Sequence, residues 1–500
     1  MRKTKHLALL VLVALCVTLF APMGVAFASS EVREITVFSW EDYIDLGYDD
    51  LSEVSDFVRD RFSDDELYTS ILDIFEEETG IKVNYHTFAT NEEMYNELLK
   101  DPSAVDLICP SEYMILKMIK EDLIKAYDVP TNYANNGSPY IKSVFDELGI
   151  NTDGGKTYAI GYMWGTMGAL YNAEAYDDED FSRWSNLMDE KFKGRITIKD
   201  SLRDSYIMAI AIVYEEELID LKEDRDANAI TDDEYNSKVF EIFNRVDKES
   251  VDKACDVLIG LKNNLYGFEV DAGKSDILTG KIDVNFAWSG DAVCTMWDAD
   301  DEGIELRYVV PEEGSNVWFD GWVMTKNADE ELASEFLNFL SSSDIAIRNM
   351  EYNGYTSCVG GDDLFSYVKE NFDEGEGDYY TDLKYFFDPE CTDDTYVIQT
   401  IDTNRHLYAQ YADEETILRC AVMDNFSNES LELVNEMWNK VKLITFSNLT
   451  IILIAVAIVI IIASYYLYKY RGKIFKIDLS PKDRKVKKGH KIVKISEIDE

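Results

Sequence analysis

The chain of 500 residues carries 48 Lys and Arg against 97 Asp and Glu, a net charge of −49. That length exceeds one ordinary hydrophobic core, so we expect two lobes or more. So negative a field makes nucleic acid an implausible partner. This negative field would concentrate cationic solutes near the protein, although the solubility of an exposed domain explains most of the acidic residues.

The N-terminus has the form of a secretory signal peptide over residues 1–28. Three basic residues precede an uncharged apolar run that ends in Ala26-Phe-Ala28. This small-x-small pattern is typical of a cleavage site, and an uncleaved anchor is the alternative. We therefore expect the rest of the chain to be exported.

The first predicted strand begins at Ile35 and ends in Trp40-Glu-Asp-Tyr43. A helix over residues 67–79 stops at Gly80, a strand follows over 81–88, a helix over 91–100 and a buried strand over 105–109. This order predicts parallel βαβ units in an α/β fold. Ligands bind beyond the carboxyl ends of such strands, so Trp40, Glu41 and Tyr43 are candidate site residues.

Later strand ends carry the same kinds of side chain. The strand over 105–109 is followed by Pro110-Ser-Glu-Tyr113, and a predicted strand over 195–198 by Asp200-Ser-Leu-Arg-Asp204. Two more strands, over 282–287 and 306–310, precede Trp288-Ser-Gly-Asp291 and Val317-Trp-Phe-Asp320. Between them, residues 215–262 read as one long charged helical stretch.

A second apolar segment, residues 443–468, lies between Lys442 and Lys469 without a charge. It reaches the roughly 20 residues needed to cross a bilayer, and a buried core helix is the alternative. Residues 469–500 hold 11 Lys and Arg against 5 Asp and Glu, as expected of a cytoplasmic tail. The sequence therefore predicts an extracytoplasmic domain, residues 29–440, tied to the cell membrane at its C-terminus.

Catalytic and metal-binding patterns are weakly supported. His86 and His406, the two histidines outside the signal and tail, lie far apart in the sequence. Gly154-Gly-Lys-Thr157 resembles the end of a phosphate loop, but Ile150 stands where the first glycine belongs. Six cysteines outside the signal show no close pairing, which argues against zinc and leaves disulfides open. We expect no enzyme, no metal and no cofactor.

At four predicted strand ends, Trp or Tyr stands beside Asp, Glu or Ser. This combination of side chains is suited to binding a linear polycation. An aromatic face attracts an ammonium group by roughly 0.5–2 kcal/mol. Burying each methylene adds about 0.8 kcal/mol. Charge-assisted hydrogen bonds to carboxylates add about 1.5–3 kcal/mol each.

Several motifs in one order resemble the spermidine/putrescine-binding proteins, the solute receptors of polyamine ABC importers. Phe38-Ser-Trp-Glu-Asp-Tyr43 resembles the family's Y-N-W-x-x-Y, and residues 75–83 match F-x-x-E-T-G-I-K-V. Residues 106–113 resemble D-L-V-x-P-S-x-Y, and Asp200–Asp204 resembles D-x-x-R-[DE]. The resemblance covers most of residues 35–357.

The resemblance implies a two-lobed α/β periplasmic-binding-protein fold of class II with the ligand in its cleft. Lobe 1 would comprise about residues 35–163 and 322–365, and lobe 2 about 168–318 and 366–440. The implied partners are a polyamine, spermidine or putrescine, and an ABC permease with its ATPase. The implied ligand-binding residues are Trp40, Glu41, Tyr43, Ser111, Tyr113, Asp204, Trp288, Trp318, Asp320 and Tyr355.

Two departures from the family pattern bear on the ligand. Glu41 stands where a family member can have Thr, and Met423 aligns with the place of a Gln. The predicted membrane segment is a third departure and suggests a bacterium with a single membrane. Three alternatives stay open: the same fold tuned to another cation such as a quaternary amine, a surface hydrolase using paired carboxylates, and an acidic adhesion or scaffold ectodomain.

Overall fold

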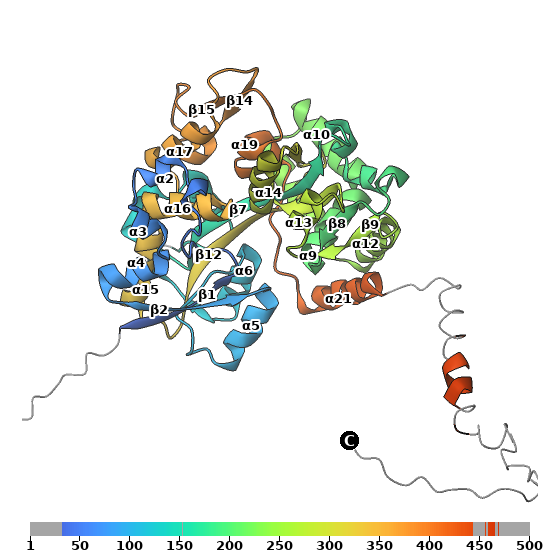
Figure 1. Ribbon diagram of the computed structural model, residues 1–500, viewed down its shortest axis with the longest axis horizontal. Coiled ribbons are helices and arrows are strands. Elements are labelled where there is room, and N and C mark those ends of the chain that lie inside the picture. Colours follow the sequence, from blue (N-terminus) through green and yellow to red (C-terminus); the bar gives the residue numbers. More distant parts are fainter. Residues whose placement is uncertain (1–32, 153, 444–455, 457–458, 466–468, 470–500) are drawn as a thin grey trace, which may run out of the picture. The chain divides into compact units, whose positions relative to one another are not determined.

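A computed structural model describes residues 33–152, 154–443, 456, 459–465 and 469, and those up to Val441 form one compact unit around an 11-stranded sheet (Figure 1). The strands are β1 (Glu34–Trp40), β2 (Lys82–Phe88), β3 (Leu107–Ile108), β4 (Ile124–Lys125), β7 (Ala159–Asn172), β8 (Ile196–Lys199), β9 (Leu265–Glu269), β10 (Val284–Trp288), β11 (Leu306–Val309), β12 (Val317–Thr325) and β13 (Thr356–Ser357). Their order is β2-β1-β3-β12-β7-β10-β8-β9, with β11 and β13 beside β7 and β4 beside β12.

At the β1 end of the sheet, β1 runs parallel to both β2 and β3, which confirms the predicted βαβ units. The helix predicted over 67–79 begins only at Ile71, because the Ser70 hydroxyl accepts the Leu72 N–H and caps it. It ends, as predicted, at Gly80 in the left-handed region with φ 70°. The helices here are α2 (Asp56–Arg59), α3 (Asp64–Leu67), α4 (Ile71–Thr79), α5 (Asn91–Lys100) and α6 (Glu112–Lys120).

Two antiparallel strands join the ends of the sheet. β7 pairs with β12 as far as Thr166 and with β10 from Met167 onward, so one strand reaches both ends. All its residues except Asn172 are buried. The helices before and after these strands are α7 (Thr131–Asn136), α8 (Pro139–Glu147), α15 (Glu330–Leu340) and α16 (Ser343–Asn353).

At the β9 end, β8 runs parallel to both β10 and β9. The helical stretch predicted over 215–262 is present and is divided into three helices. Asn228 adopts φ 55°, and Thr231 and Asp247 each cap a new helix with a side-chain oxygen. The helices are α9 (Leu202–Val213), α10 (Glu215–Asp226), α11 (Asp232–Phe243), α12 (Lys248–Leu261), α13 (Gly273–Leu278) and α14 (Ser289–Glu302).

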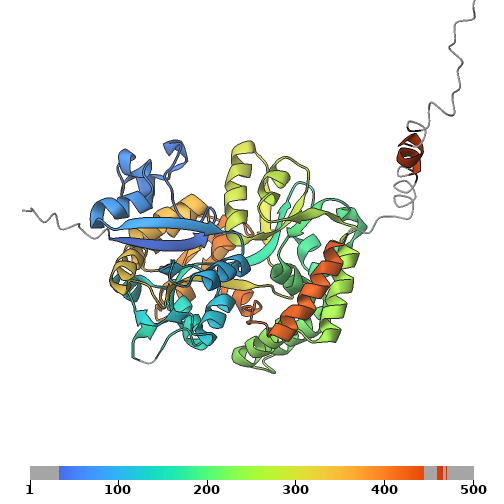
Figure 2. The same cartoon turned by 90° about the horizontal axis from the view of Figure 1, so that it is seen from below.

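The C-terminal helix α21 (Asn428–Lys442) packs at the β9 end, where Figure 2 shows it alongside neighbouring helices. The Lys262 ammonium donates to the Val441 carbonyl at 2.7 Å, and the Trp438 and Phe268 rings lie 5.4 Å apart. The elements between α16 and α21 are α17 (Asp362–Phe372), β14 (Tyr379–Asp382), α18 (Lys384–Phe387), β15 (Val397–Thr400), α19 (His406–Gln410) and α20 (Glu414–Leu418).

The predicted signal peptide and most of the predicted membrane segment lie outside the described residues. Within the described part, no helix is both long and apolar enough to span a membrane. The six described cysteines carry free thiols.

Candidate ligand-binding site

The turn after β1 sends its side chains in different directions. Trp40 closes the strand half-buried, with its ring 4.7 Å from that of Phe88, its register partner on β2. Glu41 is exposed, and Asp42 adopts a left-handed φ of 51°. This turn returns the chain to the interior, where Tyr43 is buried.

Asp320 lies buried on β12 and meets two residues predicted to share its site. The Tyr43 hydroxyl donates to Asp320 Oδ2 at 2.7 Å, and Ser111 forms an isolated backbone bridge with Asp320. Asp320 Oδ1 is buried and accepts no hydrogen bond from the described residues. Burial raises the pKa of this carboxyl to about 7, while Ser111 and Tyr43 oppose the rise. The unpartnered oxygen is suited to a ligand that donates a proton.

A second buried carboxyl, Glu112, was not among the predicted site residues. It begins α6 directly after Ser111, and its Oε2 accepts the Phe319 N–H at 2.9 Å. Burial raises its pKa to about 8, and the charge of Asp320 adds to the rise. The Pro110–Tyr113 strand end was the signal that pointed to it.

Three aromatic rings in contact with one another extend from the Tyr43 hydroxyl that binds Asp320. The rings of Tyr43 and Tyr355 lie 5.3 Å apart, and those of Tyr355 and Trp318 lie 5.6 Å apart, both edge to face. Gly290 is required beside them, because a Cβ there would lie 2.2 Å from the Tyr355 ring. We call the following set the Asp320 cluster: Tyr43, Ser111, Glu112, Trp318, Asp320 and Tyr355.

Three adjacent parallel strands of the β9 end finish in Lys199, Glu269 and Trp288. Lys199 is buried with its ammonium 3.1 Å from Glu269 Oε1, 3.3 Å from Asp291 Oδ2 and 4.2 Å from the Trp288 ring centre. It also donates to the Val270 carbonyl at 2.9 Å. With Lys274, which lies 3.8 Å from Asp291 Oδ1, these residues form the Lys199 cluster: Lys199, Glu269, Lys274, Trp288 and Asp291.

The two clusters meet at Tyr355, whose hydroxyl donates to Asp291 Oδ1 at 2.8 Å. In the Lys199 cluster both carboxylates lie within ion-pair distance of a lysine, and Lys274 also pairs with Asp271 at 2.7 Å, whereas the Asp320 cluster holds two carboxyl groups and no Lys or Arg. Asp291 was noted in the motif after the strand over 282–287 but was not among the ten predicted residues, and Lys199 and Glu269 were missed. Their partnership is set by strand register, since Lys199 and Glu269 lie opposite each other on β8 and β9.

Tyr113 and Asp204 lie beside the Asp320 cluster. The Asn91 amide donates to the Tyr113 hydroxyl at 2.9 Å and to Ser111 Oγ at 3.1 Å, so it joins Tyr113 to that cluster. Arg203, which was not predicted, stacks over the Tyr113 ring at 3.8 Å. Asp204 is buried in the first turn of α9, and burial raises the pKa of its carboxyl.

The two family departures fall in different environments. Glu41 is exposed, as described above, whereas Met423 is buried. Met423 follows Ala421, which pairs with Asn316 just before β12 begins. Of the two positions, only Met423 belongs to the interior.

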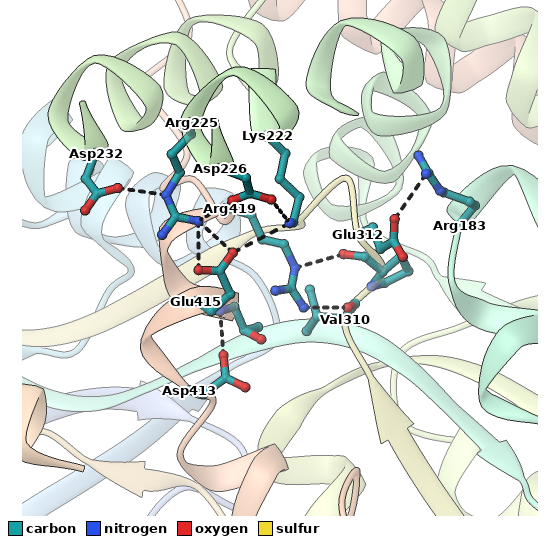
Figure 3. A network of polar contacts seen from close by, with 12 residues as sticks. Arg183, Lys222, Arg225, Asp226, Asp232, Val310, Glu312, Asp413, Glu415 and Arg419 are labelled. Carbon is teal, nitrogen blue, oxygen red and sulfur yellow. Dashed lines mark hydrogen bonds and ion pairs between the residues drawn. The ribbon is translucent and has the colours of Figure 1, made fainter. Parts of the chain in front are cut away.

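A cavity of about 1170 Å³ lies elsewhere, and none of the ten predicted residues lines it. Arg225 and Glu415 line its wall and form an ion pair at 2.6 Å, and Asp232 pairs with the same arginine at 2.7 Å. Figure 3 shows this network between α10 and α20, together with the Lys222–Asp226 pair. Among the described residues, no group of three or more His, Cys, Asp or Glu could hold a metal ion.

Comparison with known proteins gives consistent relatives. A family model described as bacterial extracellular solute-binding protein matches residues 70–360. The spermidine/putrescine-binding periplasmic protein of Escherichia coli (strain K12) is 29% identical over 290 residues, which cover 57% of this chain and 72% of that protein. The putrescine-binding periplasmic protein of the same strain is 24% identical over 358 residues, covering 67% and 80%.

A solved structure supports the same fold. The putative spermidine/putrescine ABC transporter from Listeria monocytogenes superposes with a TM-score of 0.52 at 24% identity, over 82% of this chain and 99% of that one. The α/β periplasmic-binding-protein fold predicted from the sequence is therefore confirmed.

Proposed function

The chain belongs to the family of bacterial extracellular solute-binding proteins, and from this premise we propose that it is the polyamine receptor of an ABC importer. As a member of this family it is an extracytoplasmic binding protein rather than an enzyme. Its proposed partners are a permease and that permease's ATPase. The proposal goes beyond the family in naming the ligand.

The observation that carries the proposal is the buried Asp320 carboxyl with one unpartnered oxygen, set among the rings of Tyr43, Trp318 and Tyr355. A buried carboxylate without a counter-ion is costly, so a cationic ligand that pairs with it gains much of that energy back. The rings add attraction for the ammonium group and apolar area for the methylenes. Micromolar affinity requires only about 8 kcal/mol in all.

The ten predicted residues take proposed roles around this point. Asp320 and Asp204 would accept the ammonium groups, Glu41 would add negative charge at the surface, and Ser111 would add a polar contact. The aromatic wall would be formed by Trp40, Tyr43, Tyr113, Trp288, Trp318 and Tyr355.

The two proposed lobes, residues 35–163 with 322–365 and residues 168–318 with 366–440, would close over the ligand. β7 and β12 run between the two ends of the sheet and would carry the hinge. We also propose that residues 443–468 tether the domain to the membrane, because the apolar run follows α21 directly.

Thermal unfolding with and without ligand tests the proposal. A ligand that binds only the folded state at 100 times its Kd adds about 2.7 kcal/mol of stability. We expect putrescine or spermidine to raise the Tm of the wild-type protein and not that of Asp320→Asn. Equal Tm shifts in both proteins, or a shift with glycine betaine alone, would overturn the polyamine assignment.

A further inference from the structure

The Lys199 cluster already holds an ammonium group in a setting suited to a polyamine. Lys199 Nζ contacts Glu269 Oε1 at 3.1 Å, Asp291 Oδ2 at 3.3 Å and the Trp288 ring at 4.2 Å. Two carboxylates and an aromatic face are the groups that recognise the end of an amine ligand. The side chain is only 1% exposed, so this ammonium group is fully enclosed.

We infer that Lys199 acts as an internal ammonium group at the Trp288 end of the site, and that the ligand is therefore a diamine rather than a triamine. The inference rests on the proposed function, because it identifies the substrate class of that same site. Lys199 is a specificity-determining residue in this account.

The place for an ammonium group at this end is already occupied. Lys199 pairs with both Glu269 and Asp291, and Lys274, which pairs with Asp271 at 2.7 Å, lies 3.8 Å from Asp291, so a ligand ammonium group would compete with two lysines for these carboxylates. It would also meet the positive charge of Lys199 in a poorly solvated site, where like charges repel strongly. At the other end, Asp320 Oδ1 is buried and accepts no hydrogen bond from the described residues, so an ammonium group can bind there.

Position also favours it. Tyr355 contacts the Asp320 cluster through its ring and Asp291 through its hydroxyl, so the two clusters are continuous. A ligand bound at Asp320 that extended beyond Tyr355 would come to Trp288 and Lys199. A shorter diamine would end before them.

Calorimetric titration of the full-length protein in detergent micelles with putrescine and spermidine tests the inference. We expect the wild-type protein to bind putrescine at least tenfold more tightly. Lys199→Met, which frees two carboxylates and one face of Trp288, should shift the ratio of the two Kd values at least tenfold toward spermidine. The matched control Lys193→Met removes a surface lysine that pairs with Glu190 at 3.7 Å, and it should keep the preference for putrescine.

Four results decide the matter. Tighter binding of spermidine by the wild-type protein, or an unchanged Kd ratio in a folded Lys199→Met, would overturn the role of Lys199 and leave polyamine binding intact. Binding of neither amine by the wild-type protein would overturn the proposed function and this inference together. If Lys199→Met does not fold, the wild-type protein is titrated with amines that carry two, three and four ammonium groups. An affinity that falls as the number of ammonium groups increases supports the inference, and an affinity that rises overturns it.

Discussion

The Asp320 cluster and the Lys199 cluster meet at Tyr355, yet their buried carboxyl groups have different partners. In the Lys199 cluster each carboxylate has an ammonium partner from the chain itself. In the Asp320 cluster, Asp320 interacts with the neutral Tyr43 and Ser111 side chains, and its Oδ1 accepts no hydrogen bond from the described residues. Removing one partner from a buried ion pair destabilises the fold, whereas a buried carboxylate without a cationic partner carries a desolvation cost that a cationic ligand can offset.

The largest effect is expected on the stability of the fold, from a substitution in the Lys199 cluster. Lys199→Met leaves two buried carboxylates without their shared partner, and breaking a buried ion pair in this way costs about 3–5 kcal/mol. Denaturant unfolding measures the loss. The control is Lys193→Met, because Lys193 pairs with Glu190 at the surface at 3.7 Å and such pairs contribute about 0–1 kcal/mol. Equal losses in both variants would contradict the comparison.

The next largest effect is expected on the affinity for the ligand, from a substitution in the Asp320 cluster. Asp320→Asn removes the charge that the ligand pairs with, and a charge-assisted hydrogen bond of about 1.5–3 kcal/mol corresponds to roughly 10- to 150-fold in Kd. Asp291→Asn should change the Kd for a diamine by less than about fivefold, because Lys199 and Lys274 already neutralise Asp291. Calorimetry compares the two, and equal losses would show that the clusters do not differ.

The pH dependence of binding follows from the raised pKa of Asp320. Because its pKa in the fold, about 7, lies above the ordinary value of 3.8, the fold favours the protonated carboxyl. The stability of the free protein therefore falls as the pH rises from about 4 to about 7. A diamine, whose amines resemble Lys with a pKa near 10.4, binds the ionised form. As the pH increases toward 7, the affinity of the protein for the diamine should rise by up to about tenfold per pH unit, and above pH 7 it should level off. Asp320→Asn should flatten this profile.

The smallest effect is expected at the Arg225 network of Figure 3. Arg225 pairs with Glu415 and Asp232, but both carboxylates are exposed and screened by solvent. Arg225→Met should lower the free energy of unfolding by about 1 kcal/mol or less and leave the Kd for a diamine unchanged. A tenfold change in that Kd would place the network within the binding machinery.

Local patterns in the sequence predicted much of the β1 end. The first strand, predicted to begin at Ile35, and the helix predicted over 91–100 are both present in the structure as β1 and α5. β7 was not predicted as one long strand, because a strand buried on both faces has no alternation. The helix bounds within 215–262 were missed because their breaks depend on caps at Thr231 and Asp247.

The candidate site was also predicted only in part. Side chains in a recognisable motif, such as Tyr43 and Asp320, were predicted and are in contact, although Asp320 lies within β12 and not at the end of the strand before it. Lys199 and Glu269 are 70 positions apart in the chain and carry no motif that links them. Only the parallel register of β8 and β9 brings them together. A sequence therefore indicates where a ligand is held more readily than which charges are already neutralised.

The most direct test of the central claim is calorimetric titration of residues 29–441 with putrescine, spermidine and glycine betaine. The account predicts micromolar or tighter binding of a polyamine, no heat with glycine betaine, and loss of polyamine binding in both Asp320→Asn and Trp318→Ala. Glycine betaine binding to the folded wild-type domain while both polyamines remain silent would contradict it.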